Sequence, residues 1–260
     1  MITILFFISY IGFVVTLSLL VNNLYLIILW LILGIVFGVL IVVLFMILNF
    51  PIFKKQGYKS VYMFKLSRSL TVFLNRFLFR VKINVSGQEN IPKTGKLTVF
   101  ANHKSYADPF IMFEIFNRPL TFTPKKGVYK IPVLRTLLKY LRAFPIDREN
   151  TRNTARSLID AIKVVKDGMA MLIYPEGGIK DRDEEKMVEM RAGAYKVTAK
   201  AEADLLPISV YGATQIKNRA PFRSTKIDVK IHPLIKFETV KHLSTQEMAD
   251  MMFKIINQEL

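Results

Sequence analysis

The chain has 260 residues, of which 52% are hydrophobic, and it carries a formal net charge of +17. It contains no cysteine, which excludes disulfides, a thiolate nucleophile and cysteine-ligated zinc or iron–sulfur sites. The charged residues are segregated, because residues 1–53 contain no Asp, Glu, Lys or Arg. The remainder, residues 54–260, is long enough for one α/β domain with a sizeable core.

Two long apolar runs fill the N-terminal part of the chain. Residues 1–21 form the first run and residues 24–50 the second, with only Asn22 and Asn23 between them. About 20 helical residues cross a hydrocarbon core of about 30 Å, so each run is long enough to span a membrane. A signal peptide would show a basic start and a small-residue cleavage site, and neither is evident. The sequence predicts a membrane-anchoring helical hairpin over residues 1–52, either spanning the bilayer or lying in one leaflet.

A cluster of positive charges follows the second run. The first acidic residue is Glu89, and before it come Lys54, Lys55, Lys59, Lys65 and Arg68. Positive charges flank membrane helices on the cytoplasmic side. We therefore expect the protein in the cell (cytoplasmic) membrane, with its catalytic domain facing the cytoplasm.

The segment 53–81 has the pattern of a basic amphipathic helix. On a helix, its basic residues would lie within about 120° of arc, and Phe and Leu would fill much of the rest; these basic residues are Lys65, Arg68, Arg76 and Arg80. One interpretation is a domain helix with a solvated basic face. Directly after a membrane anchor, we favour an interfacial helix that contacts anionic lipid headgroups.

Strand and helix patterns alternate through residues 82–260, which predicts an α/β domain with a mixed central sheet flanked by helices. Candidate strands cover residues 97–101, 120–123, 170–174, 205–211 and 227–231. Candidate helices cover residues 109–116, 132–141, 151–165 and 192–202. Ser244 and Glu247 form a capping box that predicts the start of a last helix.

The most informative local feature is a histidine at the end of a predicted strand. The apolar run 97–101 ends at Asn102-His103, and Asp108-Pro109 follows. On one continuous helix, His103 and Asp108 would be about 140° apart and could not pair, whereas a strand, a loop and a new helix could bring them together. Asp108 and Pro109 suit the N-cap and the first position of that helix. Asp108 is then either only a cap, or a cap whose second oxygen orients His103 as a general base.

At this point the sequence resembles a known family. Asn102-His103-x4-Asp108 is similar to the NHx4D motif of the glycerolipid acyltransferases, in particular those that acylate 1-acyl-glycerol 3-phosphate. Three further blocks resemble those of the family and occur in the same order: FPIDR at 144–148, YPEGG at 174–178 and LLPISV at 205–210. Each motif alone is weak, but four in order behind a membrane anchor are specific.

The resemblance implies a reaction. An acyl group would pass from a thioester, with acyl-CoA or acyl-carrier protein as co-substrate, to the free hydroxyl of the lysophospholipid acceptor, giving phosphatidate for phospholipid biosynthesis. His103 would take the hydroxyl proton and Asp108 would stabilise the imidazolium. No metal, other cofactor or covalent acyl-enzyme is implied, in keeping with the lack of a G-x-S-x-G elbow.

The resemblance also suggests residues that bind the substrate. Cations would hold the acceptor's phosphate, with Arg148 favoured because a guanidinium binds phosphate in a bidentate manner. The third block departs from the family, since Gly178-Ile179 stands where a Thr-Arg pair is usual, and Lys180 or Arg182 would substitute. The full set of expected substrate-binding residues is Asn102, Ser105, Lys126, Arg148, Glu176, Gly177 and Lys180.

Several alternatives remain open from the sequence. The same chemistry on glycerol 3-phosphate or another lysolipid is the nearest, and an inactive membrane-anchored scaffold is a further one. Nucleic acid is not expected as a partner, because the basic excess begins at the membrane exit and no zinc-finger or RNP-like pattern is present. His232 and His242 lack the spacing of metal ligands. The expected partners are the acceptor, the acyl donor and anionic membrane lipid.

Overall fold

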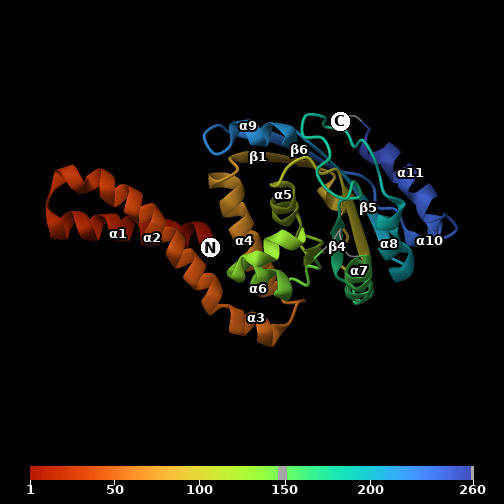
Figure 1. The fold of residues 1–260 in the computed structure, drawn as a ribbon, viewed down its shortest axis with the longest axis horizontal. Helices are drawn as coiled ribbons and strands as arrows, with labels where there is room; N and C mark the ends of the chain where they lie inside the picture. The colour runs from red at the N-terminus through yellow and green to blue at the C-terminus, as the bar shows by residue number, and fades with distance from the viewer. Residues whose placement is uncertain (146–150, 259–260) are drawn as a thin grey trace.

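A computed structural model describes residues 1–145 and 151–258 of the chain. Figure 1 shows a long helical hairpin that projects from an α/β body. The hairpin consists of α1 (Ile2–Val21) and α2 (Ile27–Leu48), joined through the short 3-10 helix η1 (Leu24–Leu26). The two helices approach closely at Gly38, where a Cβ atom would lie 2.8 Å from the Phe6 ring. The predicted hairpin over residues 1–52 is thus present as two antiparallel helices.

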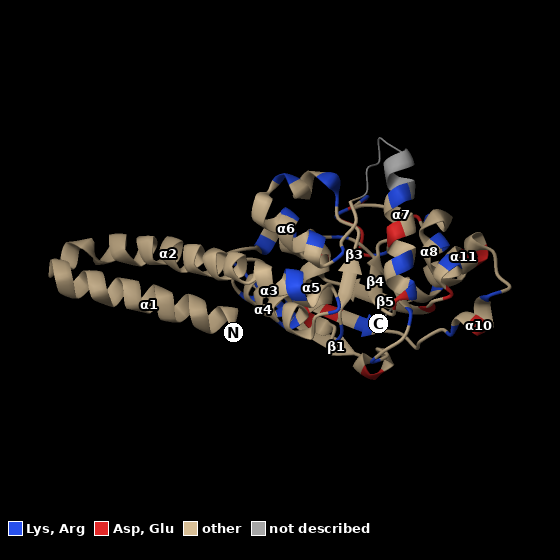
Figure 2. Ribbon diagram, turned by 90° about the horizontal axis from the view of Figure 1, so that it is seen from below, with Lys and Arg blue, Asp and Glu red and all other residues tan. Residues whose placement is uncertain are grey.

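The surface of the hairpin is apolar. Residues 2–21 and 24–56 form two helical segments that are long and apolar enough to cross a membrane, and only 6% and 22% of their most apolar windows are buried. Figure 2 shows no charged residue along either long helix of the hairpin. A core helix of a soluble protein would be mostly buried, so this exposure is consistent with membrane association.

The base of the hairpin rests on a helix of the body. The backbone N–H of Ile2 donates to Ser69 Oγ at 2.9 Å, and the rings of Phe6 and Phe73 lie 5.0 Å apart. The partner helix is α4 (Val61–Phe77), which follows α3 (Phe50–Gln56). Segment 53–81 therefore contains two helices, and Arg80 lies beyond the end of α4 with φ of 55°. The location of segment 53–81 at a membrane interface stays a prediction.

The body is built on a six-stranded sheet with the strand order β1-β6-β5-β2-β4-β3. The β5–β6 pair is antiparallel and the other neighbouring pairs are parallel, which confirms the predicted mixed sheet. The strands are β1 (Val81–Ser86), β2 (Leu97–Ala101), β3 (Leu120–Phe122), β4 (Ala170–Ile173), β5 (Asp204–Tyr211) and β6 (Thr225–Ile231). Strand β1 was not predicted, although its alternation of Val81, Ile83 and Val85 with polar residues is a strand signal.

The remaining helices cover the sheet and its edges. They are α5 (Asp108–Ile115), α6 (Pro132–Tyr140), α7 (Thr151–Lys166), α8 (Lys196–Ala201), α9 (Ile216–Arg219), α10 (Phe237–Val240) and α11 (Thr245–Ile256). The short 3-10 helices are η2 (Gln88–Asn90), η3 (Lys126–Lys130), η4 (Ala192–Tyr195) and η5 (Ala213–Gln215). The helix predicted over 192–202 divides into η4 and α8. The capping box of Ser244 and Glu247 is confirmed.

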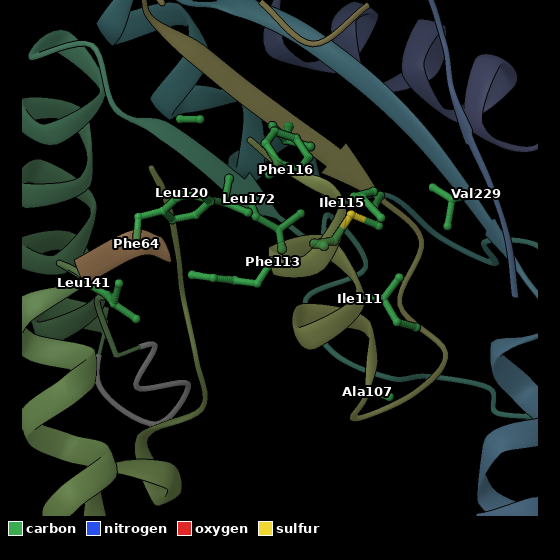
Figure 3. Packing of buried hydrophobic residues seen from close by; sticks show 14 of the residues in the cluster. Phe64, Ala107, Ile111, Phe113, Ile115, Phe116, Leu120, Leu141, Leu172 and Val229 are labelled. Atoms are coloured by element: carbon green, nitrogen blue, oxygen red, sulfur yellow. The ribbon is translucent and has the colours of Figure 1, made fainter. Parts of the chain in front are cut away.

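Helix α5 is anchored in the core on one face of the sheet. Along the fully buried strand β2, Leu97 and Val99 face one core and Phe100 faces the other, as expected for alternating side chains. Figure 3 shows Ile111, Phe113, Ile115 and Phe116 of this segment among residues of neighbouring elements, including Leu120, Leu172 and Val229. Full burial of such a side chain contributes about 1.5–3 kcal/mol. This packing fixes the first residue of α5, Asp108, relative to the end of β2.

Candidate active site

The candidate site lies at one edge of the sheet. Strands β2, β4 and β5 are mutually parallel, so their carboxyl ends meet at the same edge. The loop 102–107 follows β2, and the turn 174–177 follows β4. Strand β3 is parallel to β4 and leads into Lys125 and Lys126 from that edge as well. Sites in open α/β sheets form at the carboxyl ends of strands.

The predicted pairing of His103 with Asp108 is present. His103 Nδ1 lies 2.9 Å from Asp108 Oδ2, with the Asp108 side chain fully buried and the His103 side chain 15% exposed. The same oxygen accepts the backbone N–H groups of Lys104 at 2.7 Å and Ser105 at 2.8 Å. Three donors thus compensate one oxygen of a buried carboxylate and bend the loop around the imidazole.

The predicted capping role of Asp108 is wrong. Ala107 occupies the N-cap, Asp108 is the first residue of α5, and no side-chain cap hydrogen bond is made. The carboxylate is turned back towards the loop, where three donors need an acceptor, and its second oxygen, Oδ1, has no hydrogen-bond partner among the described residues. Oδ2 therefore both orients the imidazole and accepts the loop amides, and neither oxygen caps the helix.

The imidazole of His103 is held on its face as well as at its edge. The ring of Tyr174 stacks on it, with ring centroids 4.1 Å apart and an interplanar angle of 16°. An ionised Asp108 only accepts hydrogen bonds, so Nδ1 carries the proton and Nε2 keeps its lone pair. Burial and the nearby Asp108 carboxylate raise the pKa of the Tyr174 phenol, which stays protonated. His103 is thus oriented as a base whose Nε2 is the reactive atom.

A buried ion pair between Lys104 and Glu176 holds the backbone of His103 in place. Glu176 Oε1 accepts the backbone N–H of His103 at 2.8 Å, and Glu176 Oε2 accepts Lys104 Nζ at 3.1 Å. Both side chains are fully buried. Burial raises the pKa of Glu176, while the His103 amide and the Lys104 charge act in the opposite direction. Lys104 was missed from the sequence, where nothing signals which carboxylate it meets 72 residues further on.

Asn102 and Ser105, which were predicted to bind substrate, form hydrogen bonds to other residues of the protein. Asn102 Oδ1 accepts the N–H of Val210 at 2.8 Å, and its Nδ2 donates to the carbonyl oxygens of Val210 at 2.7 Å and Glu185 at 3.1 Å. Asn102 therefore ties the end of β2 to β5. Ser105 Oγ accepts the N–H of Ala107 at 3.2 Å inside the loop. A contact of either residue with substrate stays a prediction.

The third block forms a tight turn that an arginine covers. The N–H of Gly177 donates to the carbonyl of Tyr174 at 3.0 Å, and Gly177 has φ of 71°, a conformation that favours glycine. A Cβ atom on Gly177 would lie 3.1 Å from the guanidinium of Arg191. The backbone N–H of Arg191 donates to Pro175 O at 3.0 Å. Arg191 was missed because the chain returns to this turn only after a long irregular segment.

Cations gather beside this turn. Lys180 Nζ lies 3.0 Å from Glu189 Oε1, and Arg191 Nε lies 3.6 Å from the same oxygen. Lys180 and Arg191 lower the pKa of Glu189, with Lys180 the larger influence. The guanidinium carbon of Arg182 lies 5.1 Å from the centroid of the exposed Tyr106 ring, in the loop that carries His103. The structure brings these groups to the same edge of the sheet as His103.

The second block is described only in part. The N–H of Phe144 donates to Phe122 O at 3.2 Å, so this block runs beside the carboxyl end of β3. Arg148 lies outside the described residues. Lys126 is exposed at the start of η3, in the connection that leaves β3.

The other two histidines lie elsewhere. His232 is buried, with Nε2 2.8 Å from Ser209 Oγ, and His242 is exposed. Among the described residues, no group of three or more His, Asp or Glu side chains is placed to hold a metal ion.

Comparison with known proteins identifies the family of the chain. The model of the family described as Acyltransferase matches residues 82–211, which is half of the chain. A "1-acyl-sn-glycerol-3-phosphate acyltransferase" of Borreliella burgdorferi is 29% identical over 164 residues, covering 62% of this chain and 65% of that protein. A "Probable 1-acyl-sn-glycerol-3-phosphate acyltransferase" of Mycoplasma pneumoniae is 32% identical over 155 residues, covering 57% and 56%. The matched segment thus spans less than two thirds of the length of either relative.

A solved structure shares the fold. It is the crystal structure of the 1-acyl-sn-glycerophosphate (LPA) acyltransferase, PlsC, from Thermotoga maritima. The TM-score is 0.60 at 20% sequence identity, and the alignment covers 98% of this chain and 92% of the other.

Proposed function

Because the chain belongs to the Acyltransferase family, we propose that it transfers an acyl group to the free hydroxyl of 1-acyl-glycerol 3-phosphate and forms phosphatidate. The observation that carries this proposal is the geometry of His103, whose Nδ1 lies 2.9 Å from Asp108 Oδ2. That contact leaves Nε2 as the basic atom on a side chain that is 15% exposed. A base held in this way suits proton abstraction from an alcohol. The names of the relatives support the choice of acceptor.

The proposed reaction proceeds by direct transfer. His103 Nε2 takes the proton of the acceptor hydroxyl while the oxygen attacks the carbonyl carbon of the thioester. The C–O bond forms, the C–S bond breaks, and the imidazolium returns its proton to the leaving thiolate. The Asp108 carboxylate stabilises the transient positive charge on the ring, as the acidic partner does in other His–Asp pairs. The chain has no cysteine to form an acyl-enzyme, and none is required.

Binding of the acceptor's phosphate is assigned to the cations near the third block. Lys180 and Arg191 both approach Glu189 Oε1, and the side chain of Glu189 is 49% exposed. A phosphate entering from solvent would replace this carboxylate as their common partner at little cost, because exposed ion pairs are weak. Arg191 covers Gly177 and presents a guanidinium, which binds phosphate oxygens in a bidentate manner. We include Arg148 and Lys126 in this role on the sequence pattern.

The acyl donor is proposed to be acyl-CoA or acyl-carrier protein. Both present a thioester, the group that the mechanism needs, and both are anionic. The body of the protein carries all of the basic excess, as Figure 2 shows by its many Lys and Arg residues. This charge favours the approach of anionic donors and disfavours cationic ones. No cofactor beyond these substrates enters the proposed chemistry.

The protein is proposed to act at the cytoplasmic face of the cell membrane. The apolar hairpin would insert into the bilayer, and Lys54 and Lys55 in the last turn of α3 lie directly at its end. Positive residues at this flank favour a cytoplasmic location of the body and attraction to anionic lipid. A lysophospholipid acceptor is itself membrane-bound, so this location brings enzyme and acceptor together.

A second acceptor is favoured by one observation. Gly178-Ile179 stands where the family resemblance leads us to expect a Thr-Arg pair, and Lys180 and Arg191 are the cations proposed to act instead. The altered position of these charges would suit the same reaction on glycerol 3-phosphate or on another lysolipid.

The proposal is tested with the full chain purified and reconstituted in phosphatidylcholine vesicles. Each acceptor, namely 1-acyl-glycerol 3-phosphate, glycerol 3-phosphate and lysophosphatidylcholine, is combined with acyl-CoA or acyl-carrier protein, and products are identified by mass spectrometry. We expect phosphatidate with at least one donor and the highest kcat/KM for 1-acyl-glycerol 3-phosphate. A higher kcat/KM for another acceptor would replace the proposed substrate, and the absence of product from every pair would overturn the reaction.

A further inference from the structure

We infer that the protein has a second lipid site, which binds the headgroup of an anionic phospholipid in a cavity between α4, α5 and β1. The cavity has a volume of about 520 Å³. Its polar lining consists of Asn75, Arg76, Arg80, Lys82, Glu114 and Ser224. None of these residues belongs to the candidate active site. Strand β1 is the outermost strand of the sheet, and two strands separate it from β2, which carries His103 at its end.

The cavity carries an excess of positive charge. Arg76, Arg80 and Lys82 are exposed, and none of the three forms an ion pair with a carboxylate in the described part of the chain. Glu114 is the acidic residue in the lining, and its Oε2 already accepts Asn75 Nδ2 at 2.8 Å. Three unpaired cations around one hollow fit a phosphate group.

A buried amide oxygen indicates that the ligand also donates a hydrogen bond. Asn75 is 2% exposed, and its Nδ2 donates to Phe110 O at 3.1 Å and to Glu114 Oε2 at 2.8 Å. Because both partners are acceptors, the orientation of the amide is fixed, and Oδ1 is left without a partner. Buried polar atoms rarely stay unsatisfied. A phosphodiester has no donor, so we assign this role to a hydroxyl of the headgroup, whose binding must open the packing around Oδ1, because that atom is almost fully covered.

The position of the cavity selects a lipid over a soluble phosphate. Phe73 and Phe77 share one face of α4, and Arg76 is adjacent to that face, three residues after Phe73, whereas Asn75 points away from it. Their rings contact those of Phe6 and Phe7 at the base of the hairpin, with centroid distances of 5.0 Å and 5.5 Å. Leu78, at the end of α4, is half exposed. A headgroup in the cavity would therefore have its acyl chains beside the apolar surface of α1, an inference that rests on the proposed insertion of the hairpin.

The experiment measures lipid selectivity of the full chain in a neutral detergent. The probe is phosphatidylglycerol labelled on an acyl chain, and its binding is followed by fluorescence anisotropy. Unlabelled competitors show whether the charge, the headgroup hydroxyl or the acyl chains of the ligand determine binding. They are phosphatidylglycerol, phosphatidylmethanol (the same charge without a headgroup hydroxyl), phosphatidylcholine and soluble glycerol 1-phosphate. The variant is Arg76→Gln with Lys82→Gln, and its matched control is Lys200→Gln with Lys254→Gln, two exposed lysines on α8 and α11.

We expect the Arg76→Gln/Lys82→Gln variant to bind the probe about tenfold more weakly or worse, as for the loss of charge-assisted hydrogen bonds. The lysine control should stay within about twofold of the parent. Phosphatidylmethanol should compete less well than phosphatidylglycerol, phosphatidylcholine poorly, and glycerol 1-phosphate only at far higher concentration. The variant Lys180→Gln/Arg191→Gln, which removes the cations proposed to bind the acceptor's phosphate, should leave probe binding unchanged, which would place the lipid outside the active site.

Several results would overturn the inference. Unchanged binding in the Arg76→Gln/Lys82→Gln variant would remove the cavity as the site, and loss of binding in Lys180→Gln/Arg191→Gln would move the lipid to the active site. Equal competition by phosphatidylmethanol would remove the role of Asn75, and strong competition by glycerol 1-phosphate would identify a soluble ligand. Flotation with phosphatidylcholine vesicles tests insertion separately. A chain that floats without preferring phosphatidylglycerol refutes only this inference, whereas a chain that does not float refutes the proposed membrane location.

Discussion

His103 Nδ1 and the two backbone amides that follow it all meet one atom, Asp108 Oδ2, at 2.7–2.9 Å. The carboxylate therefore orients the imidazole and shapes the loop that carries it. Its position is fixed by α5, whose apolar residues are packed in the core of the body. The same contact links the fold to the proposed chemistry, since packing of α5 sets the geometry of the base.

Replacement of Asp108 by Asn should impair the chemical step. One amide oxygen would still accept the loop N–H groups, but the variant has no negative charge to stabilise the imidazolium. We expect kcat to fall at least about 100-fold, within the range for general acid–base catalysis, with a smaller change in KM. Steady-state kinetics with both substrates measure this, and the exposed residue Asp250 supplies the control Asp250→Asn. A variant with unchanged kcat would show that the charge has no catalytic role.

Loss of one partner of the buried ion pair should destabilise the protein. Lys104→Met leaves Glu176 buried without its cation, a change that costs about 3–5 kcal/mol. Adding Glu176→Gln removes the unpaired buried charge and keeps an oxygen that accepts the His103 amide. The double variant should therefore regain most of the stability that Lys104→Met loses. Thermal unfolding followed by circular dichroism in detergent compares the three proteins. A double variant no more stable than Lys104→Met would contradict this account.

Two glycines allow a matched test of the turn in the third block. Gly177→Ala introduces a Cβ at φ of 71° and 3.1 Å from the Arg191 guanidinium, whereas Gly193 has neither feature. We expect Gly177→Ala to lower stability by about 1–2 kcal/mol, from the left-handed backbone alone, and to displace Arg191. Gly193→Ala should have a much smaller effect. Unfolding midpoints give the comparison, and equal effects in both variants would argue against the strained turn.

The buried His232 should make stability depend on pH. Burial, and to a lesser degree Lys230, lowers the pKa of His232 below its ordinary value of 6.5. Ser209 Oγ donates to Ile256 O at 2.7 Å, so it accepts a hydrogen bond from His232 Nε2. Below about pH 6.5 the unfolded chain binds a proton that the folded chain does not, so stability falls as the pH is lowered.

The matching variant is His232→Gln, which keeps a donor for Ser209 and does not titrate. Between pH 7 and pH 5, its unfolding midpoint should change less than that of the parent protein. If the two proteins lost stability equally over this range, His232 would not be the titrating group.

The sequence predicted those parts of the structure that depend on local pattern. The apolar run of β2, the helix-starting Asp108-Pro109 and the capping box at Ser244 are short signals, and the strand and the helix starts were found close to where the structure has them. The spacing of His103 and Asp108 suits a strand–loop–helix corner but left open whether Asp108 is only a cap, and the resemblance to the acyltransferase motif led to the prediction of their contact. Strand β1 was overlooked although Val81, Ile83 and Val85 alternate with polar residues.

Contacts between distant segments could not be predicted in the same way. Lys104 meets Glu176 only because β2 and β4 are neighbours, and strand order is not encoded in either strand alone. The position of Arg191 over Gly177 depends on the path of the intervening segment. Acceptance of the Lys104 and Ser105 amides by Asp108, in place of a helix cap, was missed because a helix cap and a loop acceptor have the same residue preference.

The proposed role of His103 as the base in acyl transfer is tested with one pair of variants. Phosphatidate formation from 1-acyl-glycerol 3-phosphate and an acyl thioester is measured for the parent protein, for His103→Ala and for His242→Ala, which removes an exposed histidine. We expect a loss of about 100-fold or more in kcat for His103→Ala and nearly unchanged kinetics for His242→Ala. A His103→Ala variant that is folded and keeps close to parental activity would contradict it.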